Sequence, residues 1–160
     1  MHEPRLNRAL RTLLNTQRVA ALGTLNPDGS PLVSMVPFAI DAEATCLVIH
    51  VSQLAAHTGN MLVTKKVSLM VMQAEVPGEP VHALARVSLE GTANRLTPES
   101  SPWLSARAAY LARFPDAEPM TQLGDFSFFA IHLSGARQIA GFGTARSLDL
   151  DEVRQVLTPH

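Results

Sequence analysis

The tetrapeptide Asn26-Pro27-Asp28-Gly29 constrains the fold of this chain more than any other segment. Proline presets a backbone dihedral suited to a turn, and glycine accepts the positive φ that closes a hairpin loop. Apolar runs lie on both sides of the turn, at residues 19–25 and 32–40. The segment therefore predicts two antiparallel strands joined by a tight loop.

Further strands are predicted along the rest of the chain. Residues 82–96 alternate between polar side chains, such as Arg86 and Glu90, and apolar ones, such as Val87 and Leu89, which is the period of a strand. Other strands are expected at 45–51, 67–72, 126–133 and 136–142, and helices at 4–15, 53–63, 97–113 and 148–157.

A doubly wound sheet would need a helix after almost every strand, and this chain has too few. We therefore predict a mainly β protein with flanking helices (α+β), built as an antiparallel barrel of six or seven strands. The length of 160 residues suits one domain spanning 1–160.

Composition excludes several classes of protein. A formal net charge of −1 with 17% charged residues is too balanced for a nucleic-acid-binding surface. No apolar run approaches the ~20 residues of a membrane span. The single cysteine, Cys46, rules out an internal disulfide framework and a Cys-rich zinc site, and its apolar neighbours indicate a buried thiol. We expect a soluble, cytoplasmic protein with no nucleic-acid or membrane partner. The hydrophobic fraction of 46% beside so few charges hints at a permanent dimer.

Two features could hold an anion. The segment 52–60, Ser-Gln-Leu-Ala-Ala-His-Thr-Gly-Asn, directly follows a predicted strand and combines hydroxyls, an imidazole and a helix N-terminus, which can bind phosphate. Ser52 could equally be an ordinary N-cap of a surface helix. Arg86 could be a bidentate anion clamp or a solvated edge residue. The histidines do not cluster at metal-ligand spacings, so no metal site is predicted, and no residue can be named as catalytic.

An ordered series of short motifs runs from about residue 5 to 155. They are Ala21-Leu22-Gly23-Thr24-Leu25, the segments 29–34, 36–38 and 52–60, Val67-Ser68-Leu69, Arg86-Val87-Ser88-Leu89-Glu90-Gly91, Gly124-Asp125-Phe126 and Gly141-Phe142-Gly143. This series resembles the pyridoxamine 5′-phosphate oxidase-like, FMN-binding split-barrel superfamily. It is more similar to the HugZ-type haem-utilisation branch within it.

The resemblance implies a six-stranded split barrel that forms a homodimer with two FMN sites at the subunit interface. It implies that the strand after the first hairpin faces the isoalloxazine and that the strand–helix turn takes the phosphate side. Arg86 would come from either subunit. The cofactor-binding residues implied in this way are Val33, Ser34, Met35, Val36, His50, Val51, Ser52, His57, Thr58 and Arg86.

The chain also departs from the vitamin B6 oxidases. Gln53 and Leu54 stand where those enzymes carry basic residues for the flavin phosphate, and their C-terminal Arg-Leu-His-Asp-Arg-like motif is missing. We therefore expect an FMN-dependent oxidoreductase acting on another substrate, with His57 as the best candidate acid or base.

Two alternatives remain open. The HugZ-type branch implies a haem-binding or haem-degrading protein, with His160 as iron ligand and Asp125 in the Gly-Asp-Phe position. The third possibility is a binding or regulatory dimer without a cofactor.

Overall fold

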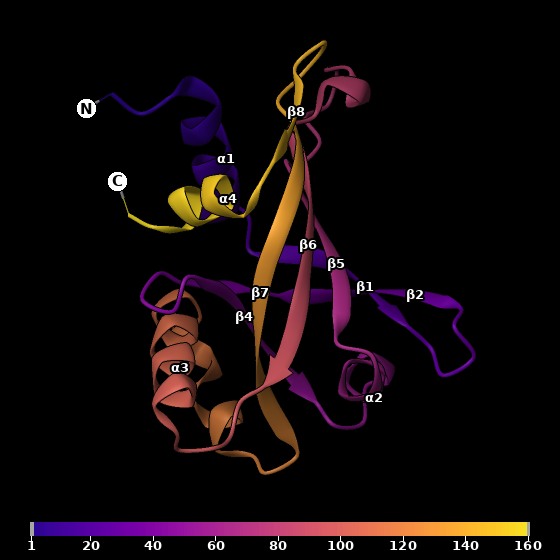
Figure 1. Cartoon of the computed structure of the whole chain (residues 1–160), viewed down its shortest axis with the longest axis vertical. Coiled ribbons are helices and arrows are strands. Elements are labelled where there is room, and N and C mark those ends of the chain that lie inside the picture. The colour runs from indigo at the N-terminus through magenta and orange to yellow at the C-terminus, as the bar shows by residue number, and fades with distance from the viewer. Residues whose placement is uncertain (1, 160) are drawn as a thin grey trace.

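The computed structural model describes residues 2–159 as one antiparallel sheet with helices packed on it (Figure 1). The strands are β1 (Val19–Leu25), β2 (Pro31–Pro37), β3 (Ala39–Asp41), β4 (Cys46–Ser52), β5 (Lys66–Met72), β6 (Arg86–Arg95), β7 (Phe126–Ile139) and β8 (Ala145–Leu148). The helices are α1 (Arg5–Thr16), α2 (Ala56–Val63), α3 (Ser101–Arg113) and α4 (Leu150–Leu157), with 3₁₀ turns η1 (Val81–Ala83) and η2 (Pro115–Gln122).

The strand order makes the sheet curl into a split barrel. It runs β2-β1-β5-β6-β7-β4-β3, with β8 added to β7. β2 and β3 stand at opposite ends of this order, yet only Phe38 separates them in the chain. The two ends of the sheet must therefore come together at Phe38. This confirms the predicted mainly β fold with flanking helices.

Several predicted boundaries were wrong for reasons visible in the strand pairing. The run predicted at 32–40 is two strands, because β2 pairs with β1 as far as Pro37 and β3 pairs with β4 from Ala39. The strands predicted at 126–133 and 136–142 are one long strand, β7, which pairs with β6 along both halves. With β8 added, the sheet has eight strands.

The turn predicted at residues 26–29 is confirmed, whereas the cap considered at Ser52 is not. Gly29 closes the first hairpin with a φ of 84°, and its N–H donates to the carbonyl of Asn26 over 2.8 Å. Ser100 caps α3, and Asp149 caps α4 in a reciprocal capping box with Glu152. Ser52 does not cap α2, because that helix begins at Ala56.

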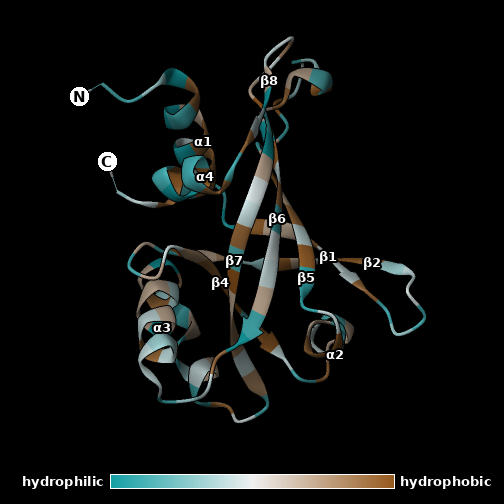
Figure 2. Cartoon of the chain, in the orientation of Figure 1, coloured by the Kyte–Doolittle hydropathy of each residue, from teal (hydrophilic) through white to brown (hydrophobic). Residues whose placement is uncertain are grey.

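The apolar side chains form two cores on opposite sides of the β4–β7 ladder. The larger core fills the barrel and includes Leu22, Leu89 and Phe129. The smaller lies between α3 and the outer side of β4 and β7, around Phe128 and the thiol of Cys46. Burial raises the pKa of that thiol to about 12, so it is an inert apolar group. Figure 2 shows hydrophobic stretches along the strands and hydrophilic ones on α1 and α4.

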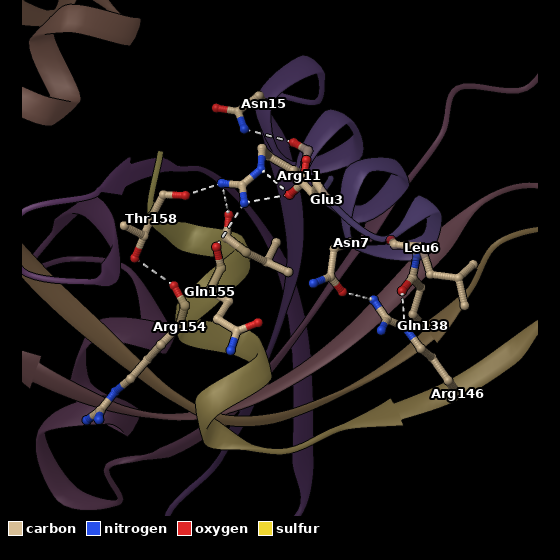
Figure 3. A network of polar contacts seen from close by, with 11 residues as sticks. Glu3, Leu6, Asn7, Arg11, Asn15, Gln138, Arg146, Arg154, Gln155 and Thr158 are labelled. Atoms are coloured by element: carbon tan, nitrogen blue, oxygen red, sulfur yellow. Dashed lines mark hydrogen bonds and ion pairs between the residues drawn. The ribbon is translucent and has the colours of Figure 1, made fainter. Parts of the chain in front are cut away.

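Polar contacts join α1 to the C-terminal elements (Figure 3). The Arg11 guanidinium pairs with Glu3 over 2.7 Å and donates to the carbonyls of Gln155, Val156 and Thr158 at the end of α4. A cation on these last carbonyls satisfies acceptors that the helix leaves open. Contacts of Arg146 with Asn7 and Gln138 extend the network to β8 and β7.

In the part of the chain that the structure describes, every helix is too short or too polar to cross a bilayer.

Gly91 lies beside a register shift between β6 and β7, where the backbone of β7 comes too close for a side chain. A Cβ there would lie 2.7 Å from the carbonyl oxygen of His132, whereas a Cβ on Gly59 in α2 meets nothing within 4 Å. We expect Gly91→Ala to lower the free energy of unfolding by ~1–3 kcal/mol. Gly59→Ala should instead raise it by ~0.5–1 kcal/mol. Urea denaturation followed by circular dichroism measures both, and equal effects would contradict the packing described here.

Candidate functional site

The outer face of the sheet is covered on one side and open on the other. α3 packs over β4 and β7, whereas outward side chains of β2 and β5, such as Met35 and Met70, stay exposed in the part of the chain that the structure describes. The strand register places Met35, Ala21 and Met70 in one row across this open face. Val33 is 71% exposed and Met35 is 63% exposed. A contiguous apolar surface of this kind is typical of an interaction or ligand site.

The open face contains a shallow hollow of about 540 Å³. Its floor carries small residues from neighbouring strands, among them Gly23 on β1, Ser68 on β5 and Thr92 on β6. The apolar side chains of Leu25 and Val33 form its other side. A flat floor with an apolar wall suits a planar ligand better than a bulky one.

Charged and titratable groups surround this hollow. Lys66 and Glu90 line it, and the register places Arg137 opposite Ser88 and His132 opposite Thr92 on the same face. Sequence reasoning did not select Gly23, Lys66, His132 or Arg137. The alternation of β5 and β6 assigns a face to each residue, but only the strand order shows which residues share a surface.

Part of the predicted phosphate-binding turn does come together. The Ser34 hydroxyl on β2 lies 2.9 Å from Nδ1 of His57 on α2. The Thr58 hydroxyl donates to the carbonyl of Ser52 over 2.6 Å, and the Ser52 hydroxyl accepts from the N–H of Leu54 over 3.1 Å. Burial lowers the pKa of His57, which favours a neutral imidazole at this position.

The other predicted residues of β2 and β4 divide between surface and core. Val33 and Met35 lie on the open face, whereas Val36 and Val51 are buried inside the barrel. Only the backbone groups of Val36 and Val51 are therefore available to a ligand.

Arg86 lies far from the turn within one protomer. It pairs with Ile139 at the end of β7, whereas Ser52 pairs with Phe126 at the start of the same 14-residue strand. The Arg86 guanidinium donates to the carbonyl of Leu84 over 2.8 Å and to that of His82 over 3.3 Å. A site that uses both Ser52 and Arg86 must take the arginine from a second copy of the chain.

His50 is placed in the smaller core, with its side chain only 8% exposed. Its ring lies 4.3 Å from the ring of Phe128, 5.2 Å from Phe126 and 5.8 Å from Tyr110. Nδ1 of His50 is buried without a hydrogen-bond partner. Burial lowers its pKa to about 4, so the imidazole is neutral at pH 7.

Within residues 2–159, no three His, Cys, Asp or Glu side chains are grouped so that they could hold a metal ion. The proposed iron ligand His160 lies outside the described residues.

Comparison with known proteins adds the decisive observation. The family model for pyridoxamine 5′-phosphate oxidase matches residues 6–140, which is most of the chain. The chain belongs to the pyridoxamine 5′-phosphate oxidase family.

Proteins similar to this chain are named for haem. Haem oxygenase HutZ of Vibrio cholerae is 26% identical over 150 residues, covering 93% of this chain and 84% of that protein. The chloroplastic haem oxygenase HOZ of Arabidopsis thaliana is 35% identical over 138 residues, covering 85% of this chain but only 40% of that protein.

A solved structure gives the same picture. The haem-binding protein from Mycobacterium smegmatis superposes with a TM-score of 0.85 at 27% identity, covering 97% of this chain and 62% of that one. The chain thus spans less than two thirds of HOZ and of the mycobacterial protein.

These relatives overturn the first functional expectation. The resemblance to the family was confirmed, but the interpretation as an FMN-dependent oxidoreductase was wrong, because the similar proteins are named as haem oxygenases and a haem-binding protein. The error arose because the shared barrel motifs specify the fold, whereas cofactor choice depends on few residues.

Burial of His50 predicts a pH effect on stability. Its pKa falls from 6.5 to about 4 on folding, so the unfolded chain binds a proton more readily between these values. Above pH 6.5, His50 is neutral in both the folded and the unfolded chain, and the free energy of unfolding does not depend on its titration. As the pH falls toward 4, the free energy of unfolding decreases by roughly 1–3 kcal/mol, because only the unfolded chain takes up the proton. His50→Phe should remove this component, and urea titrations of both proteins from pH 7 to 4 measure it. Parallel pH curves would show that His50 is not buried as described.

Proposed function

We propose that this protein binds haem on the open face of its sheet, between two copies of the chain, and degrades it in the manner of a haem oxygenase. The observation that carries the proposal is the similarity to haem oxygenases over 93% and 85% of the chain. The geometry of the open face supports it.

The floor of the hollow fits the shape of haem. Haem is planar and largely apolar, and a bulky side chain beneath it would hold it away from the sheet. Gly23, Ser68 and Thr92 keep the floor low, and Leu25 and Val33 offer apolar contact. Burial of apolar surface is worth roughly 25 cal/mol per Å², which favours this contact.

Glu90 lines the hollow and opposes an anion, but Lys66, Arg137 and Arg86 outnumber it on this face and can pair with the two propionates of haem. Lys66 lines the hollow, and Arg137 lies on the same face of β7. Arg86 stands opposite Met72 on β5, at one end of the open face. Guanidinium groups pair with carboxylates in a bidentate manner, so Arg86 and Arg137 are suited to this role.

One sheet covers only one side of a flat ligand. A second copy of the chain, related by a two-fold axis, would bury the exposed Val33 and Met35 and cover the other side of the haem. The proposed site is thus complete only in the homodimer.

When bound, haem supplies the iron at which oxygen is activated. The chain holds the macrocycle, pairs the propionates and excludes water. His160 would ligate the iron, and exposed His132 on the open face is the alternative.

Haem titration tests the function directly. We expect a saturable Soret band in the wild-type protein and its loss when ascorbate and oxygen are added.

Gly23→Leu should weaken haem binding at least ~10-fold by raising the floor, since a Cβ there meets only ordinary contacts at 3.5 Å or more. Gly59→Ala is the control and should bind normally. His160→Ala should shift the Soret band, whereas a shift only in His132→Ala would reassign the ligand. Absence of a Soret band in the wild type would reject the function.

Oligomeric state tests the shared site. Met35→Asp places a charge in the proposed interface and should convert the dimer to a monomer with at least ~10-fold weaker haem binding. Met120→Asp, on exposed η2, is the matched control and should remain dimeric. Size-exclusion chromatography with light scattering measures both. A monomeric wild-type protein that binds haem would refute the two-copy site while leaving the haem function standing.

A further inference from the structure

A second cavity, of about 500 Å³, lies on the covered side of the sheet. It is bounded by the end of β6, the start of α3, η2 and the start of β7. None of its lining residues lines the hollow on the open face. It is therefore separate from the proposed haem site.

A buried histidine, His50, lies at one end of this cavity. The imidazole lines the cavity, is 8% exposed and carries a buried Nδ1 without a hydrogen-bond partner. Buried polar atoms in folded proteins are nearly always hydrogen-bonded, so an exception needs an explanation. Because the ring is neutral at pH 7, one of its nitrogens can accept a hydrogen bond from an O–H or N–H donor.

The walls of the cavity are aromatic. Trp103 and Phe128 meet edge to face at 5.7 Å, and Phe126 stacks on the His50 ring at 5.2 Å. All of these side chains line the cavity. Aromatic walls favour a flat ring, through offset-stacked or edge-to-face contacts.

The rim of the cavity is cationic. Arg95 is exposed there, and Arg107 donates through Nε to the Thr121 hydroxyl over 3.2 Å. Arg107 approaches the Glu118 carboxylate only to 3.9 Å, so this pair leaves the guanidinium largely available. Glu99 also lines the cavity and opposes an anion, but two guanidinium groups outnumber it.

We propose that this cavity binds a small aromatic carboxylate that carries a hydroxyl or N–H donor on its ring. The ring lies against Trp103 and Phe126, the carboxylate pairs with Arg95 and Arg107, and the donor reaches the imidazole of His50. This ligand uses the three chemical features of the cavity together.

The chain contains one tryptophan, Trp103, so its fluorescence reports this cavity alone. We expect 4-hydroxybenzoate to change this emission saturably in the haem-free full-length protein, and benzoate, which lacks the donor, to bind at least ~10-fold more weakly. Arg95→Gln should weaken 4-hydroxybenzoate binding ~10-fold, while Arg8→Gln on α1 should not. His50→Phe should reduce the preference for 4-hydroxybenzoate over benzoate to about one.

The outcomes separate this proposal from the haem function. Saturable binding with the expected preference supports the cavity whether or not the protein binds haem. No saturable change with either compound, or equal affinity of the wild-type protein for both, overturns it. If His50→Phe fails to fold, the Arg95→Gln and Arg8→Gln pair still decides, because both residues are exposed. Equal effects of those two substitutions would also overturn the proposal.

Discussion

The closure of the sheet at Phe38 is the constraint on which the rest of this structure depends. The Phe38 side chain is fully buried between β2 and β3, which stand at opposite ends of the strand order. Arg113 of α3 donates to the Phe38 carbonyl over 2.9 Å and lies over its ring at 5.0 Å. The same guanidinium donates to the carbonyl of Leu14 over 2.8 Å. One residue thus joins the barrel corner, α1 and α3.

This closure divides the outer surface of the barrel into two parts with different chemistry. Since α3 is fixed at the corner, it covers β4 and β7 and encloses the aromatic cavity around His50. The strands farther from α3, β1, β2 and β5, stay open and carry exposed Met35 and Val33. The covered part provides a cavity with aromatic walls, whereas the open part provides an exposed apolar surface that is suited to haem and to a second copy of the chain.

The candidate sites also differ in how their polar groups are satisfied. At the turn after β4, the Thr58 hydroxyl donates to the Ser52 carbonyl, and His57 is paired with Ser34 of β2, so these polar groups already have partners within the chain. On the covered side, the Nδ1 atom of His50 has no partner. The first arrangement stabilises the fold without a ligand, whereas the second places a neutral imidazole in the wall of an aromatic cavity.

The sequence by itself determined the elements that arise from local chemistry. Asn26-Pro27-Asp28-Gly29 forms the first hairpin, and the alternation of β6 separates its two faces, because dihedral preference and side-chain period act within a few residues. Only the tertiary structure decided that Ser52 and Arg86 lie at opposite ends of β7, that Gly23 and Thr92 share a floor, and that His50 is buried without a partner. These relations depend on strand order and barrel closure, which join residues distant in the chain and leave no periodic pattern in the sequence.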